Sequence, residues 1–218
     1  MTRSESSPQA LRIGVCGHLW LNAEQRLRVH NAALAALTGH CQRQGEPRRV
    51  ALYSGLAPGA DLVLTAAIME CLQARRTECE LHVRMIADAE HLIEHWLRRG
   101  EELGHGPTDQ ARQAVRERMS YWLGRARSVS VISLPASGLC SPFQALAAQL
   151  AQDPQLLFAV QRPDHPGGPG GTAEILKWRQ QPELIPDELR NGQYPRFVQQ
   201  SIIINPDSGV VTSVGEPG

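Results

Sequence analysis

The sequence predicts an α/β protein with a Rossmann-like three-layer fold and a mainly parallel sheet. Short β-prone runs alternate with longer runs of helical periodicity along most of the chain, which is the pattern of βαβ units. Three turns of small residues stand between a strand-like run and a helix-like run, and the first of them is Gly17-His18. The length of 218 residues suits one domain with a substantial core.

The first half of the chain predicts three strand-helix pairs. We expect strands at residues 11–16, 49–53 and 79–86, and the third shows clear alternation of apolar and polar side chains. We expect helices at residues 22–44, 60–75 and 89–103. Pro47 ends the first helical region, and the Gly and Pro residues of 104–107 stop the third.

The second half begins with the best helix of the chain, at residues 108–126. Its apolar side chains recur on one face at Ala111, Val115, Met119, Trp122 and Ala126. A fourth strand is expected at 128–134 and a last one at 197–204, with helices at 142–152 and 172–180. Residues 136–165, which include the apolar run 156–160, resemble an insertion.

These elements predict one domain over residues 10–205. Residues 1–9 are polar, and we expect them to be disordered. The C-terminal tail, 206–218, is rich in turn residues.

Composition narrows the range of partners. The 22 basic side chains balance 22 acidic ones, so we do not expect nucleic acid to be a partner, because nonspecific binding to phosphates needs surplus positive charge. The five cysteines are odd in number and form no CxxC pair. With no secretory signal, this predicts reduced thiols and a cytoplasmic protein. No zinc-ligand spacing and no apolar run of about 20 residues occur, so neither a metal nor a membrane is expected.

The most informative segment is the glycine-rich run that opens the helix at 172–180. It contains Gly167, Gly168, Gly170 and Gly171, followed directly by Thr172. Glycine lets backbone amides approach a ligand closely, and a helix N-terminus adds unpaired N–H donors and a positive dipole end. We therefore predict an anion site here, most often a phosphate site. The alternative is a flexible loop before an ordinary helix.

The other two turns follow the strands at 11–16 and 49–53. The first contains Gly17 and His18, and the second is Ser54-Gly55-Leu-Ala-Pro-Gly59-Ala-Asp61. Ligands of parallel sheets bind beyond the carboxyl ends of the strands, so these residues are candidates for contact with the same ligand. Ser54, Asp61 and His18 each have an alternative role as turn or helix-start residues.

These three turns resemble those of the SLOG superfamily, which includes the Lonely Guy phosphoribohydrolases and the DNA-processing protein A family. The resemblance covers about residues 11–180. It implies a Rossmann-like fold that binds nucleotides or molecules derived from them. The second turn is the most specific match, whereas the first has Leu19 where the family usually has arginine.

The resemblance also implies candidate catalytic residues. The Lonely Guy motif Pro-Gly-Gly-x-Gly-Thr-x-x-Glu matches this chain through Glu174, with its threonine displaced by one position to Thr172. The family's Arg-Lys-x-x-Met motif is matched loosely by Arg116-Glu-Arg-Met119. In that family the loop holds the nucleotide phosphate and the glutamate helps to cleave the N-glycosidic bond.

Two functions from different classes follow from these observations. The first is a binding or sensor protein for a nucleotide-like small molecule, with no further cofactor and with homo-oligomeric assembly expected. The alternative is a nucleoside 5′-monophosphate phosphoribohydrolase that uses Glu174 and Arg116 and releases free base and ribose 5-phosphate. Glu174 would then stabilise an oxocarbenium-like centre or activate water; its structural alternative is an acidic residue that favours the helix start. A DNA-binding relative is disfavoured by the zero net charge.

Overall fold

The computed structural model describes residues 10–102, 108–134, 138–164, 167–191 and 199–215. Its centre is one seven-stranded sheet, made of β1 (Leu11–Gly17), β2 (Arg49–Ser54), β3 (Glu78–Met85), β4 (Ser128–Val131), β5 (Leu156–Val160), β6 (Gln200–Ile204) and β7 (Val211–Val214). The strand order is β4-β3-β2-β1-β5-β6-β7. All neighbours are parallel except β6 and β7, which pair antiparallel.

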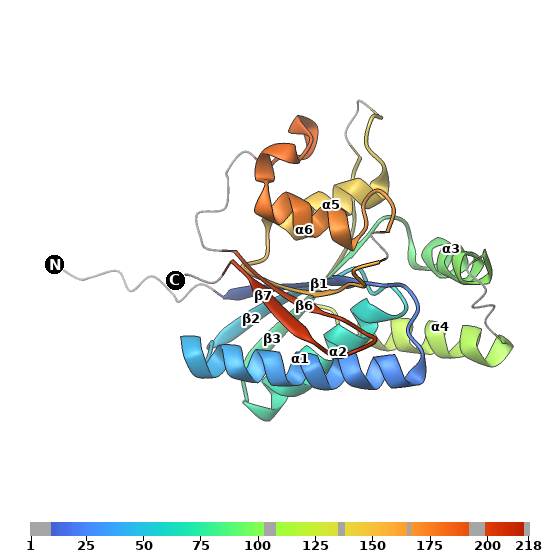
Figure 1. Cartoon of the computed structure of the whole chain (residues 1–218). Coiled ribbons are helices and arrows are strands. Elements are labelled where there is room, and N and C mark those ends of the chain that lie inside the picture. Colours follow the sequence, from blue (N-terminus) through green and yellow to red (C-terminus); the bar gives the residue numbers. More distant parts are fainter. Residues whose placement is uncertain (1–9, 103–107, 135–137, 165–166, 192–198, 216–218) are drawn as a thin grey trace.

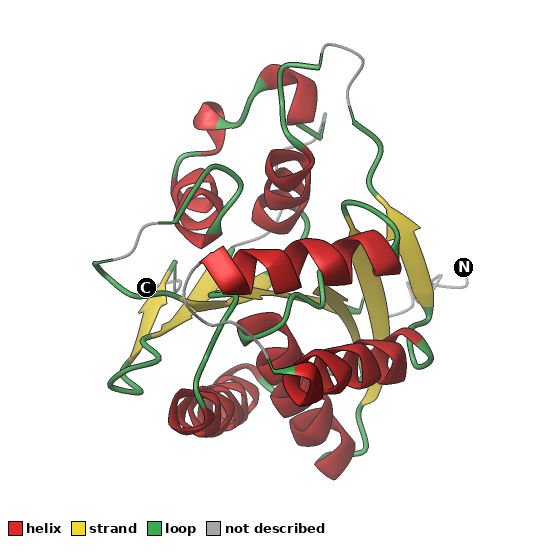
Figure 2. Cartoon of the chain, turned by 90° about the vertical axis from the view of Figure 1, so that its right-hand side faces the viewer, coloured by secondary structure: helices red, strands yellow, loops and turns green. Residues whose placement is uncertain are grey.

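Helices cover both faces of this sheet and complete the three layers, so the predicted fold class is confirmed. One face carries α1 (Ala23–Gln44), α2 (Ala60–Ala74) and α4 (Asp109–Leu123), and the other carries α5 (Pro142–Gln152) and α6 (Thr172–Gln180). The helix α3 (Ala89–Glu102) lies beyond the carboxyl ends of the strands, on the right of Figure 1, and crosses in front of the sheet in Figure 2. Two short 3-10 turns follow α6, η1 (Pro182–Leu184) and η2 (Asp187–Leu189).

The helix starts fall into two kinds. At the start of α1, the Asn22 side chain accepts a hydrogen bond from the Gln25 backbone N–H at 2.8 Å, and the Gln25 side chain accepts one from the Asn22 N–H at 2.9 Å. Ser141 and Gln144 form the same capping box at α5. In contrast, α2 begins after Gly59 and α6 after Gly171, and neither has a side-chain cap. The first amides of these two helices are therefore left without a capping side chain.

The largest difference from the sequence analysis concerns residues 136–165, which we expected to be an insertion. Within the described part, this stretch forms α5 and then β5, which pairs with β1 on one side and β6 on the other. Every side chain of β5 is buried. A strand buried on both faces has a continuous apolar run instead of alternation, so its periodicity does not distinguish it from a buried helix segment.

Smaller differences lie at the ends of elements. The strand expected at 128–134 ends at Val131, and the helix expected at 108–126 ends at Leu123. The tail contains the edge strand β7 in addition to turns. The expected disorder of residues 1–9, and the start of the strand expected at 197, fall outside the described residues. Among the helices that the structure describes, none is both long and apolar enough to cross a membrane.

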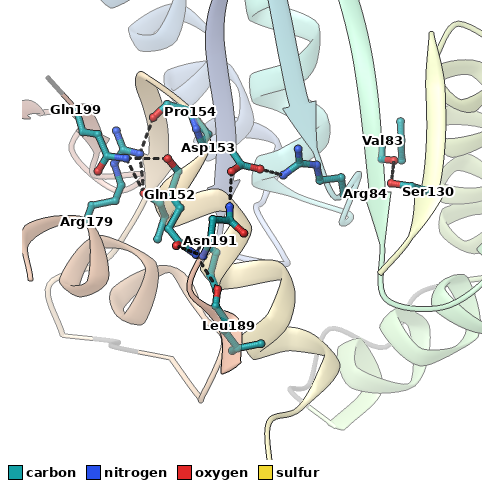
Figure 3. Close-up of polar contacts among 12 residues, drawn as sticks. Val83, Arg84, Ser130, Gln152, Asp153, Pro154, Arg179, Leu189, Asn191 and Gln199 are labelled. Atoms are coloured by element: carbon teal, nitrogen blue, oxygen red, sulfur yellow. Dashed lines mark hydrogen bonds and ion pairs between the residues drawn. The ribbon is translucent and has the colours of Figure 1, made fainter. Parts of the chain in front are cut away.

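A buried arginine connects the second half of the fold. The Arg179 side chain is 8% exposed. It donates hydrogen bonds to the Ser201 hydroxyl (3.0 Å) and to the carbonyl oxygens of Ala151 (3.2 Å), Pro154 (2.9 Å), Gln155 (3.3 Å) and Gln200 (2.9 Å). Burial lowers the pKa of Arg179 to about 10, so the guanidinium stays charged at neutral pH. These contacts join α6 to the end of α5, the start of β5 and β6 (Figure 3).

We predict that Arg179→Met destabilises the protein by on the order of 3 kcal/mol, because it removes five hydrogen bonds that a buried, charged donor makes. Urea unfolding monitored by circular dichroism measures the effect. The matched control is Lys177→Met on the exposed side of the same helix, which should change stability by less than about 0.5 kcal/mol. Equal unfolding midpoints for the two variants would contradict this role.

Candidate functional site

The order of the strands reverses beside β1. The chain goes from β1 to β2 on one side, continues to the edge strand β4, and returns to place β5 on the other side of β1. In open α/β sheets, ligands bind outside the carboxyl ends of the strands at such a point. The three glycine-bearing loops follow β1, β2 and β5 and therefore lie at this same edge of the sheet.

A cavity of about 490 Å³ lies at this edge. Its wall contains seven of the predicted site residues, which are Gly17, Gly55, Asp61, Gly168, Gly170, Gly171 and Thr172. The first turn of α5 and the inner face of α3 supply the remaining sides through Phe143, His95, Trp96 and Arg99. Three loops that are far apart in the sequence thus share one cavity with α3.

The glycine loop is held by its own hydrogen bonds. The Gly171 N–H donates to the Gly168 carbonyl oxygen at 2.9 Å, and the Gly170 N–H donates to the Glu174 carboxylate at 2.5 Å. Gly170 has a φ of +77°, and a Cβ there would lie 2.5 Å from the backbone of Phe143. Glu174 therefore has a structural role in the loop, which is the alternative that the sequence left open for it.

Two helices begin at the cavity wall without side-chain caps. Thr172 opens α6 and Asp61 lies in the first turn of α2, and both residues line the cavity. The amides of a first helical turn have no partner within the helix, and the dipoles place partial positive charge at both ends. The first amide of α2, Ala60, donates to the His18 carbonyl oxygen at 2.9 Å, so the start of α6 is the better placed of the two to bind an anion through backbone donors.

Asp61 is a titratable group of this wall with an unusual environment. Its side chain is buried, and one carboxylate oxygen accepts a hydrogen bond from the Ala57 N–H at 3.4 Å. Burial raises the pKa of Asp61 from 3.8 to about 7, although hydrogen bonds from the Ala57 and Gly55 backbones oppose this shift. A carboxyl group with a pKa near 7 can donate or accept a proton at neutral pH.

The Cys16 thiol lies in the same wall at the end of β1. Burial, followed by the charge of Asp61, raises the pKa of Cys16 far above its ordinary value, although the charge of Arg179 opposes this shift. The thiol is therefore protonated at neutral pH and is not an activated nucleophile.

His18 connects the loops and does not line the cavity. Its ring Nε2 accepts a hydrogen bond from the Arg162 N–H at 3.0 Å, and its carbonyl oxygen accepts one from the Ala60 N–H at 2.9 Å. The loop after β1 is thereby tied to the loop after β5 and to the start of α2.

Ser54 and Gly59 shape the second turn. The buried Ser54 hydroxyl oxygen accepts hydrogen bonds from the Leu56 N–H at 3.1 Å and from the Thr65 hydroxyl at 3.0 Å. Gly59 has a φ of +109°, and a Cβ there would lie 2.0 Å from the Leu19 carbonyl oxygen. Both residues hold the turn in place, and the cavity is lined by their neighbours Gly55, Ala57 and Asp61.

The arginines of the cavity are not those that the sequence indicated. Arg116, the expected catalytic arginine, forms an ion pair with Glu94 and lies outside the lining. Arg84 and Arg99 line the cavity instead. Arg84 donates to the Asp153 carboxylate at 2.6 Å (Figure 3), and Arg99 donates to Glu102 at 2.7 Å. The position of Arg84 close to the end of a predicted strand was the available signal.

No protein-family model matches the chain, and no curated protein matches it significantly. In the part of the chain that the structure describes, no three His, Cys, Asp or Glu side chains are grouped so that they could hold a metal ion.

The raised pKa of Asp61 predicts a pH-dependent stability. Between its ordinary pKa of 3.8 and the folded value of about 7, the folded protein keeps a proton that the unfolded chain has released. The Asp61 contribution to the free energy of unfolding therefore falls as pH rises through this window, by about 1.4 kcal/mol for each pKa unit. The loss of stability caused by the ionised Asp61 carboxylate is complete above about pH 7.

We therefore expect Asp61→Asn to gain stability relative to the wild type as pH rises through this window, with no further gain above it. Urea unfolding of both proteins at several pH values measures the difference. Asp109→Asn, at an exposed position of α4, serves as the control and should show no such trend. A difference between Asp61→Asn and wild type that is constant with pH would contradict the assignment.

Proposed function

We propose that this chain binds a nucleotide or nucleotide-derived small molecule in the strand-end cavity, as a binding or sensor protein of the SLOG type. One observation carries the proposal. The glycine-bearing loops after β1, β2 and β5 meet around a single cavity where the strand order reverses, and two helices without side-chain caps begin there. This combination of backbone donors and strand-end position is typical of phosphate-bearing ligands.

The phosphate would lie against the start of α6. The Gly168 position is open, because a Cβ built there has no atom within 4 Å. The first amides of α6, from Thr172 onward, have no capping side chain. Arg99, in the wall formed by α3, pairs with Glu102 at 2.7 Å and has further N–H donors that can contact an anion.

The remainder of the cavity would hold the nucleoside. Trp96 and Phe143 give an apolar wall with flat rings, on which a base can stack. Asp61 lies in the wall with a carboxyl group that can hydrogen-bond a ribose hydroxyl in either protonation state. A volume of about 490 Å³ is within the range of small-molecule sites.

The path of the chain also supports the family resemblance. In the Lonely Guy enzymes the glycine loop directly follows a strand, and here β5 is the strand that precedes the glycine loop in the chain. All five cysteines are free thiols, which fits the cytoplasmic location that we propose with this function.

A phosphoribohydrolase is the second candidate, and the environment of Asp61 favours it. A buried carboxyl group with a pKa of about 7 in a cavity wall is suited to general acid-base chemistry. Glu174 is already occupied by the Gly170 N–H. If the protein cleaves an N-glycosidic bond, Asp61 is better placed than Glu174 to move the proton.

Binding is tested by isothermal titration of AMP into wild type, Gly168→Val and Gly170→Val. We expect wild type to bind, and Gly168→Val to bind at least about tenfold more weakly with an unchanged melting temperature. Gly170→Val should instead lower the melting temperature, because its Cβ would contact the Phe143 backbone. Equal affinity of Gly168→Val and wild type, or no binding of any nucleotide to wild type, would overturn the proposal.

Turnover is tested by chromatographic detection of free base released from AMP. If the wild type shows activity, we expect Asp61→Asn to lose it by about a hundredfold or more. Glu174→Gln should keep most of it, since an amide oxygen can still accept the Gly170 N–H. The opposite pattern would assign the chemistry to Glu174. A wild type that binds AMP without cleaving it would support the sensor function instead of the enzyme.

A further inference from the structure

A second cavity lies on the face of the sheet that α1, α2 and α4 cover together (Figure 1). Its volume is about 740 Å³, and side chains of all three helices line it together with Trp20 from the loop after β1. The first turn of α2 separates the two cavities, because Asp61 faces the strand-end cavity and Leu62 faces this one. We call it the three-helix cavity.

The wall of the three-helix cavity holds two arginines that acidic groups do not neutralise. Arg26 comes from α1 and Arg118 from α4. Neither forms an ion pair within the described ranges of the chain. Both side chains line the same cavity, and burial, followed by the charge of Arg118, lowers the pKa of Arg26. Bringing two cations together costs free energy that an anion between them would recover.

The other charged groups of this wall do not supply that anion. Glu117 lines the cavity, but its carboxylate accepts a hydrogen bond from the Gln113 side chain at 2.9 Å. His30 contacts the Glu70 carboxylate at 3.1 Å. Glu117 keeps its negative charge in this wall, where it forms no ion pair with either arginine among the described residues, and the two guanidinium groups outnumber it.

Aromatic and apolar side chains make up most of the remaining wall. Tyr121 and Trp122 of α4 meet edge to face with their ring centroids 5.0 Å apart, and Trp20 also belongs to the lining. Tyr121 is 50% exposed and Leu27 is 62% exposed. The Arg125 guanidinium lies 3.8 Å from the centroid of the Tyr121 ring. Partly exposed flat rings beside cationic groups are the components of a site for planar anions, because they combine stacking with charge pairing.

We propose that the three-helix cavity binds a planar organic anion, that is, an aromatic ring with a carboxylate, sulfonate or phosphate group. Arg26 and Arg118 hold the anionic group, which guanidinium forks can contact through two N–H donors each. Tyr121 and Trp122 contact the ring. The site is separate from the strand-end cavity and does not depend on the function proposed for it.

Anilinonaphthalene sulfonate, a fluorescent aromatic anion, is a suitable probe for this site. We expect saturable binding to the wild type at one site. Arg26→Gln/Arg118→Gln should weaken it by at least about tenfold, and Arg118→Gln alone, at an exposed position, should weaken it in part. The matched control is Arg112→Gln, also on α4, which pairs with Glu101 outside this cavity and should bind as the wild type does.

Two further measurements make the outcome decisive. The uncharged parent, phenylnaphthylamine, should bind more weakly than the sulfonate and should not respond to the arginine substitutions. A crystal structure with the sulfonate should place it in the three-helix cavity. The proposal is wrong if the double variant, which should keep the wild-type melting temperature, binds the sulfonate as tightly as wild type does, or if the sulfonate occupies only the strand-end cavity.

Discussion

The buried guanidinium of Arg179 fixes the position of α6, and the candidate phosphate site depends on that position. Its donors reach carbonyl oxygens at the end of α5 and at the start of β5 and β6, and no carboxylate is among these acceptors. The carbonyl oxygens at the end of α5 carry the negative end of a helix dipole, which suits a buried cation. With α6 held at this end, its opposite end opens toward β1 and presents the glycine loop to the cavity.

The cavity exists because the chain reverses direction across the sheet at β1. The first half of the fold supplies Gly17, Gly55 and Asp61, and the second half supplies the glycine loop. His18 bonds these halves together through the Arg162 N–H. The same closeness that brings the loops together buries Asp61, and this burial raises the pKa of its carboxyl group to about 7. The meeting of these loops at β1 therefore both forms the cavity and raises the pKa of the Asp61 carboxyl group in its wall.

Local patterns in the sequence predicted the fold well where a signal was specific. Alternation identified β3, and the helices expected at 142–152 and 172–180 have these same bounds in the structure. The pattern of β5 carried no such signal, so a central strand was expected as part of an insertion.

Prediction of the site was limited in a different way. The glycine turns indicated which loops could form the site. They did not indicate the partners of the side chains, because the Arg162 N–H that donates to the His18 ring lies 144 residues away from His18 in the sequence. Helical spacing placed Arg116 on a helix surface but could not show that its side chain forms an ion pair with Glu94. It also could not show that Arg84 and Arg99 line the cavity instead. Which arginine faces a ligand depends on how helices and strands pack, and no local pattern contains that information.

The most direct test of phosphate binding at the start of α6 is an NMR titration of isotope-labelled protein with AMP, read from the backbone amides. Binding there predicts that the amides of Gly168, Thr172 and Ala173 shift most, since a phosphate would accept hydrogen bonds from them. Amides of β7, on the far edge of the sheet, should not move. Saturating AMP that leaves the amides of residues 168–173 unmoved would contradict a phosphate site in this loop.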